Sequence, residues 1–87
     1  MRIKVADGRG AVWIEFVEDT QVDVSRALHA VKMEKPEILQ RWCDEEGQLR
    51  GNLDVFLNGE NIRYQEGLTT QLRDGDEVYV IAHIAGG

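Results

Sequence analysis

The chain of 87 residues ends in two glycines, Gly86 and Gly87, which follow an apolar run over residues 78–85. Because glycine has no side chain, these two positions can enter a slot too narrow for any residue that carries a Cβ atom. Such an ending suits a protein whose reactive group is its own terminal carboxylate, here that of Gly87. The alternative is a glycine-rich end without a function, since chain ends are often poorly ordered. The residues upstream of the two glycines are needed to distinguish a reactive chain end from one without a function.

Few other residues could carry chemistry. Cys43 is the single cysteine, so an internal disulfide is excluded, and one cysteine with two histidines cannot build a metal site without carboxylates. Cys43 stands beside Trp42 in an apolar stretch, which favours a buried side chain over a nucleophile. We therefore expect no bound metal.

Length and charge limit the classes of partner. A chain of this length forms one small domain. The net charge of −6 and the scattered basic residues argue against nucleic acid, whereas an acidic body suits a basic protein surface or serves solubility alone. No apolar run approaches the ~18 residues of a membrane span, and the amino-terminal residues lack the apolar stretch of a signal peptide. We expect a cytoplasmic protein without a membrane partner.

The first half of the chain predicts a hairpin followed by a helix. Residues 1–6 and 11–17 alternate between apolar and polar side chains on either side of a glycine-rich turn. Thr20 is a candidate helix cap, with Asp23 three residues later. An apolar stripe at helical spacing follows it, formed by Val24, Ala27, Leu28 and Val31.

The middle of the chain predicts a second short helix. Pro36 breaks the first helix or opens another, whose inward face would be Ile38, Leu39 and Trp42.

The second half predicts short strands. A strand is expected over 53–57, a tight turn at Asn58-Gly59, a short strand over 61–64, a helical turn over 67–72 and a last strand over 77–82. This order of elements is that of an α+β fold of the β-grasp type, a mixed sheet wrapped over one main helix. We expect one core, formed by Val24, Leu28, Val31, Val55, Val78 and Val80.

The residues of the second half also resemble a known family. Segments 58–63, 67–68 and 72–78, with the ending over 84–87, resemble the ubiquitin-like sulfur carrier proteins. These include the small subunit of molybdopterin synthase and the carriers of the thiamine and cysteine pathways. The Asp-Gly-Asp turn at 74–76, followed by a strand and a terminal Gly-Gly, carries most of the resemblance. It implies a β-grasp domain over 1–81 and a flexible tail over 82–87.

The resemblance implies the following chemistry. An adenylating partner enzyme transfers AMP from ATP to the carboxylate of Gly87, and a sulfur donor then displaces AMP to leave a thiocarboxylate that donates sulfur in biosynthesis. The protein would be a co-substrate or the small subunit of a sulfur-transferring complex, not an enzyme, and would bind no cofactor itself. Its partners would be the adenylating enzyme and a sulfur-accepting synthase. Contacts to them are expected from Tyr79, Ile81, His83, Ile84, Ala85 and Gly86.

Two departures from the family concern the acceptor of the sulfur. Small subunits of molybdopterin synthase usually have a proline pair where this chain has Ala82-His83, and residues 33–51 are longer than in thiamine-pathway carriers. These features favour a relative of the cysteine-pathway carrier or an archaeal type. Two other classes stay open, a protein modifier conjugated through Gly87 to lysine and a plain β-grasp interaction module. Phe56 and Trp13 are further candidates for the partner face.

Overall fold

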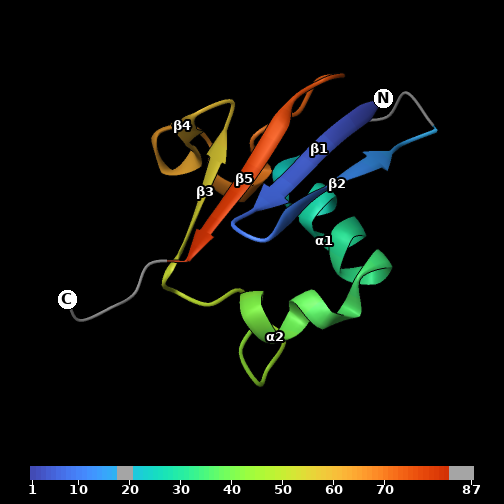
Figure 1. The fold of residues 1–87 in the computed structure, drawn as a ribbon. Helices are drawn as coiled ribbons and strands as arrows, with labels where there is room; N and C mark the ends of the chain where they lie inside the picture. The colour runs from blue at the N-terminus through green and yellow to red at the C-terminus, as the bar shows by residue number, and fades with distance from the viewer. Residues whose placement is uncertain (18–20, 83–87) are drawn as a thin grey trace.

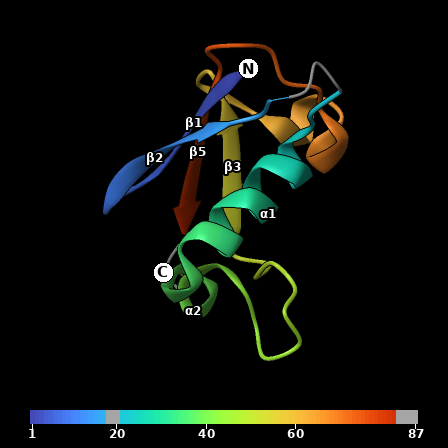
Figure 2. The ribbon, with the colours of Figure 1, turned by 90° about the vertical axis from the view of Figure 1, so that its right-hand side faces the viewer.

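A five-stranded sheet forms the centre of the protein, and one helix lies across one of its faces (Figure 1, Figure 2). The computed structural model describes residues 1–17 and 21–82. The strands follow the order β2-β1-β5-β3-β4, in which β1 and β5 are parallel and the other pairs antiparallel. The helices and strands are β1 (Arg2–Asp7), β2 (Gly10–Glu15), α1 (Val24–Glu34), α2 (Leu39–Trp42), β3 (Leu53–Leu57), β4 (Glu60–Asn61) and β5 (Glu77–Ala82). This is the predicted α+β fold of the β-grasp type.

The predicted hairpin is confirmed. β1 and β2 pair antiparallel, with Ile3 opposite Ile14 and Val5 opposite Val12. Ile3, Val5 and Ile14 are buried against the helix, whereas Arg2 and Trp13 are exposed on the other face. The alternation of the sequence therefore sets which face of the hairpin enters the core.

Helix α1 begins later than the sequence predicts. Asp23, not Thr20, is the N-cap of the helix, and its carboxylate accepts a hydrogen bond of 2.8 Å from the backbone N–H of Arg26. An aspartate in this place satisfies one of the free N–H groups of the first turn. Thr20 itself lies outside the described residues. The predicted stripe is confirmed, because its four residues, Val24, Ala27, Leu28 and Val31, are all buried.

Pro36 opens the second helical segment. A 3₁₀ turn over Pro36–Ile38 leads directly into α2, and Ile38 and Trp42 are buried. The prediction that Leu39 also faces inward is wrong, since its exposed fraction is 41%. Ile38 and Trp42 are four residues apart and share one helix face, whereas Leu39 is turned by about 100° from Ile38. Cys43 is buried, as predicted.

The region between β3 and β5 contains less strand than predicted. Asn58 and Gly59 have φ values of 51° and 89°, as the expected tight hairpin turn requires. The predicted strand over 61–64 is wrong beyond Asn61, because Ile62–Tyr64 forms a 3₁₀ turn. The side chain of Asn61 starts this turn by accepting a hydrogen bond of 2.9 Å from the backbone N–H of Arg63. The helical turn expected over 67–72 is present but shorter, over Gly67–Thr69.

The predicted core is confirmed as one cluster. It contains the six expected residues, Val24, Leu28, Val31, Val55, Val78 and Val80, all buried between α1 and the sheet. The proposed division into a domain over 1–81 and a tail over 82–87 stays a prediction, because residues 83–87 lie outside the described part of the chain. Among the described helices, none has the length and apolar character needed to cross a membrane. The cytoplasmic location stays a prediction.

Candidate functional site

The end of β5 is the described part of the chain that lies nearest to the two terminal glycines in sequence. Along β5, Val78 and Val80 are buried under α1, whereas Tyr79 is half-buried and Ile81 is 37% exposed on the opposite face of the sheet. This confirms the predicted alternation of the strand. The other five expected partner and reactive positions lie outside the described residues, namely His83, Ile84, Ala85, Gly86 and Gly87.

A row of apolar side chains crosses the outer face of the sheet beside Ile81. Tyr79 is paired with Ala6 of β1 on one side and with Phe56 of β3 on the other. Phe56 is half-buried, so it belongs to this row and adds to the face that Tyr79 and Ile81 present. Trp13 is 48% exposed, but the guanidinium of Arg2 covers its ring at 4.5 Å from the centroid. Trp13 is therefore engaged in a cation–π contact at the β2 side of the sheet.

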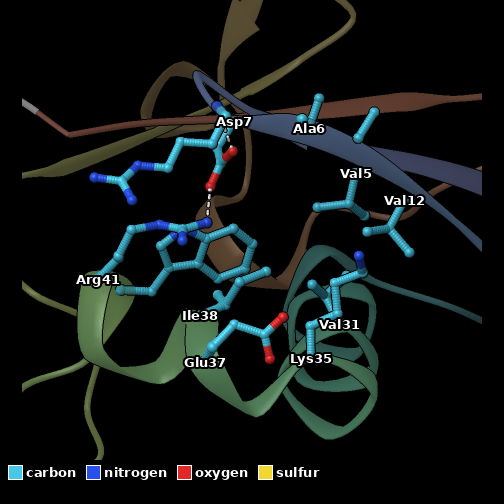
Figure 3. A pocket seen from close by; sticks show the side chains of 13 residues that line it. Val5, Ala6, Asp7, Val12, Val31, Lys35, Glu37, Ile38 and Arg41 are labelled. Atoms are coloured by element: carbon cyan, nitrogen blue, oxygen red, sulfur yellow. Dashed lines mark hydrogen bonds and ion pairs between the residues drawn. The ribbon is translucent and has the colours of Figure 1, made fainter.

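An ion pair between Asp7 and Arg41 lies at the same end of the sheet, on the side of the helices. The parallel pairing of β1 with β5 places Asp7 beside Val80. The carboxylate of Asp7 accepts a hydrogen bond of 2.8 Å from the guanidinium of Arg41, in α2 (Figure 3). The exposed fractions of these two side chains are 12% and 31%. This ion pair joins the end of β1 to α2.

The surroundings of Asp7 lower its pKa. Burial acts to raise the pKa of this carboxyl, but the hydrogen bonds from Arg41, from the backbone N–H of Arg9 and from Trp42, together with the charge of Arg41, outweigh it. The pKa of Asp7 therefore lies below its ordinary value. Since the charged form is favoured in the folded state, the pair stabilises the fold wherever Asp7 is ionised.

Replacing Asp7 with Asn should make the stability less dependent on pH. At pH 7, Asp7→Asn should lower the free energy of unfolding by about 1–3 kcal/mol, since it removes a charged hydrogen-bond acceptor from the Arg41 guanidinium. Because the folded pKa is depressed, the difference should be fully present above the ordinary aspartate pKa of 3.8 and should vanish as the pH falls through the folded value. Urea unfolding of both proteins between pH 7 and pH 2 measures this difference.

Glu77→Gln is the matched control for Asp7→Asn. Glu77 pairs with Lys4 at 3.4 Å, but both side chains are substantially exposed. Losing this pair should cost at most about 0.5 kcal/mol at pH 7. A stability difference for Asp7→Asn that stays constant down to pH 2 would show that the ion pair has no pH-dependent role.

Two cavities flank the Asp7–Arg41 pair. The first, of about 210 Å³, lies between the hairpin and the helices; Figure 3 shows Val5, Val12 and Val31 on one side of it and the ion pair on the other. The second, of about 420 Å³, lies at the end of β5 and is lined by Tyr79, Ile81 and Ala82 among others. Asp7, Arg9, Arg41 and Trp42 line both cavities. The structure thus places Tyr79 and Ile81, the two described residues among the predicted partner contacts, in the lining of a cavity at the end of β5; their role in binding stays a prediction.

The sequence prediction missed Asp7, Arg9 and Arg41 as part of this site. One signal was present, because Asp7 follows Ile3 and Val5 at the spacing of two that marks the core face of β1. A carboxylate on that face needs a buried partner. Nothing in the local pattern identifies that partner as Arg41, which is distant in the sequence and on another element.

The comparison with protein families covers nearly the whole chain. Residues 10–87 match the ThiS family. The chain belongs to the ThiS family. This confirms the resemblance to ubiquitin-like sulfur carriers that was inferred from the sequence.

Several relatives of this ThiS-family chain have names. A protein of Archaeoglobus fulgidus named as a candidate sulfur carrier is 43% identical over 49 residues, which are 56% of either chain. The sulfur carrier protein CysO of Mycobacterium tuberculosis is 37% identical over 41 residues, 47% of this chain and 44% of CysO. The alignments thus span about half the length of these two relatives. Small archaeal modifier protein 3 of Haloferax volcanii is 31% identical over 81 residues, 92% of this chain and 84% of the relative.

Solved structures agree with the fold of the ThiS-family chain. The crystal structure of SAMP1 from Haloferax volcanii matches with a TM-score of 0.81 and 22% identity over the whole of both chains. A chain in the crystal structure of the BexX/CysO complex of Amycolatopsis orientalis matches with a TM-score of 0.71 and 24% identity, covering 98% of this chain and 99% of that chain. At such identities the likeness supports the β-grasp fold alone.

Proposed function

We propose that this protein is a sulfur carrier whose Gly87 carboxylate is adenylated by a partner enzyme and converted to a thiocarboxylate. The family match carries this proposal, because it extends over residues 10–87 and so includes the two glycines. The described structure supports it through the exposed outer face of β5, where Ile81 stands close to the chain end. The names of the relatives CysO and the Archaeoglobus protein support the sulfur-carrier part of the proposal.

The proposed reaction has two steps, both on the Gly87 carboxylate. A carboxylate is a poor acyl donor because its leaving group would be oxide. In the first step, a carboxylate oxygen attacks the α-phosphorus of ATP, forms an acyl adenylate and releases pyrophosphate. In the second step, a sulfide sulfur attacks the acyl carbon and forms a C–S bond. The bond from this carbon to the phosphate oxygen breaks, AMP leaves with its electron pair, and the proton of the sulfide goes to solvent. The product is a thiocarboxylate, whose ionised sulfur is a nucleophile at neutral pH.

The protein acts in this scheme as a co-substrate and not as an enzyme. The catalytic groups belong to its partners, an adenylating enzyme that uses ATP and a synthase that accepts the sulfur. The protein itself binds no cofactor for these steps. If residues 83–87 are extended, they reach about 17 Å beyond Ala82, the last residue of β5, at ~3.3–3.6 Å per residue. That length is enough to place Gly87 in a partner's active site.

The partner face proposed for the body is the outer face of β5 and β3. Ile81, Tyr79 and Phe56 form an apolar surface beside the chain end, and aromatic side chains of this kind are common anchors in protein interfaces. Ile84 and Ala85 would then occupy apolar positions along the partner's channel, and Gly86 and Gly87 its narrow part. His83 serves as a solvated spacer, as a ring that stacks on the partner or as a hydrogen-bond donor at the channel mouth.

A protein modifier is the second candidate function. The observation in its favour is the relative named small archaeal modifier protein 3, which aligns with 92% of this chain. In this scheme the same activated Gly87 is transferred to the amine of a target lysine, and AMP leaves as before. Adenylation is therefore common to both candidates, and only the nucleophile differs.

Intact mass spectrometry of the protein purified from its native host tests the proposal. We expect a fraction of the chain to carry the mass of one sulfur in place of one oxygen, and to react with an electrophilic thiol probe that leaves an ordinary carboxylate unchanged. The unmodified mass also reports whether the mature chain ends at Gly87. A chain without sulfur, together with ladders of lysine conjugates, would replace the carrier by the modifier. If neither the thiocarboxylate nor lysine conjugates are found, only the plain β-grasp interaction module remains as a candidate.

A further inference from the structure

The cavity at the end of β5 has an apolar floor and a charged rim. We call the apolar part of its lining the floor, which includes Trp42, Leu53 and Ala82 from α2, β3 and β5. We call the charged part of its lining the rim, which consists of Arg9 in the turn between β1 and β2 and the Asp7–Arg41 pair. Ala82 is the last described residue before the segment that leads to Gly87. The cavity therefore adjoins the described strand end that is nearest in sequence to Gly87.

Arg9 is the cation of the rim that is available to a partner. Its backbone N–H donates a hydrogen bond of 2.8 Å to Asp7, which fixes the turn. Within residues 1–17 and 21–82, no hydrogen bond or ion pair engages its guanidinium, and the residue is exposed. Arg41, by contrast, is already paired with Asp7 at 2.8 Å. The turn therefore offers one unpaired positive charge in a chain whose net charge is −6.

We propose that this cavity is a second docking point for the adenylating partner, which places a carboxylate against Arg9 and an apolar side chain on the floor beside Trp42. The inference rests on the proposed function, because it assumes a partner that takes up Gly87. The cavity adjoins the outer face of Ile81 and Tyr79, which also line it, but it extends around the end of the sheet to Arg41 and Trp42 of α2. The partner would thus hold the root of the segment from two sides.

The charges of the protein favour this occupant over a second copy of the chain. Two copies, each with a net charge of −6, repel one another. An acidic segment on a partner is attracted to Arg9, while the paired Asp7 keeps its own charge neutralised by Arg41. Charge complementarity at the edge of an interface acts chiefly on association and fixes the register of the partners. Arg9 would therefore orient the chain end as well as strengthen docking.

Charge reversal at Arg9 tests the inference. ATP–pyrophosphate exchange by the cognate adenylating enzyme is measured against the concentration of the wild-type protein, Arg9→Glu, Arg9→Gln and Arg73→Glu. The two Glu variants change the net charge equally, but Arg73 precedes β5 at the opposite end of that strand from Ala82. We expect Arg9→Glu to raise KM about tenfold with kcat unchanged, Arg9→Gln to raise it about threefold, and Arg73→Glu to leave it near the wild-type value. The effect should shrink at high salt.

The outcomes separate this inference from the proposed function. Equal KM values for wild type and Arg9→Glu, with normal exchange by both, would overturn the docking point and leave the carrier intact. An equal rise in KM for Arg73→Glu would overturn it too, by showing a response to net charge alone. If the wild-type protein sediments as a dimer and Arg9→Glu sediments as a monomer, the cavity would bind a second copy of the chain and the proposed docking point would be wrong. No exchange by the wild-type protein would end both proposals together.

Discussion

Deleting Gly87 should abolish ATP–pyrophosphate exchange by the adenylating enzyme and leave the melting temperature unchanged. In the proposed reaction the carboxylate of Gly87 is activated, and deletion moves the terminal carboxylate back by one residue, up to about 3.6 Å along an extended chain. A displacement of this size at a reacting centre is sufficient to prevent attack. The described core lies between α1 and the sheet and extends no further along the chain than Val80, so the fold should not respond.

Gly86→Val extends this test to the width of the partner's channel. A β-branched side chain at this position should block threading and reduce exchange to the background, because only a residue without a Cβ passes a slot shaped for glycine. Gly51→Val is the matched control, since a Cβ at Gly51 meets no atom within 4 Å and should leave exchange unchanged. Normal exchange by the protein that lacks Gly87 would refute the carrier and the modifier alike.

The parts of the fold that the sequence predicts are those set by local periodicity. Val78 and Val80 alternate with Tyr79 and Ile81, and this alternation alone decides which pair enters the core. The buried stripe of α1 follows in the same way from its helical spacing. The turn at Asn58 is equally local, since its φ of 51° is a conformation that asparagine tolerates better than most residues.

The parts that the sequence does not predict depend on side chains that choose among several backbone partners. Asn61 caps the N–H of Arg63 and so converts an expected strand into a 3₁₀ turn. Asp23 captures the N–H of Arg26 and thereby moves the start of α1. In both cases a short polar side chain competes with the regular pattern of the backbone, which apolar spacing does not register.

The sequence analysis missed part of the candidate site for a different reason, because this part depends on a contact between residues far apart in the sequence. Asp7 and Arg41 stand on β1 and α2 and meet only because α2 packs at the end of the sheet. Their pairing leaves Arg9 as the exposed cation of the turn. The outer face of β5 could be predicted from alternation within one strand, whereas the cavity beside it requires β1, α2, β3 and β5 to be in place together.

Replacing Leu28 with Ala should remove a large part of the stability of this domain. Leu28 is 2% exposed and lies in the central cluster between α1 and the sheet. Truncation leaves a cavity where a leucine was packed and should lower the free energy of unfolding by ~2–5 kcal/mol. Domains of this size have ~5–15 kcal/mol in total. The melting temperature, measured by circular dichroism, should fall by roughly 10–30 °C.

Met33→Ala on the same helix is the control for Leu28→Ala. Met33 is 70% exposed, so its truncation removes little packing and should change the stability by less than about 0.5 kcal/mol. The comparison holds the helix constant and varies only burial. Because alanine is a better helix former than leucine or methionine, a large loss at both positions would show that the effect does not follow burial. A melting temperature unchanged by Leu28→Ala would mean that α1 does not present this face to β1 and β5. The packing of α2 at the end of β5 would then be in question as well, because both helices are positioned by packing against the same sheet.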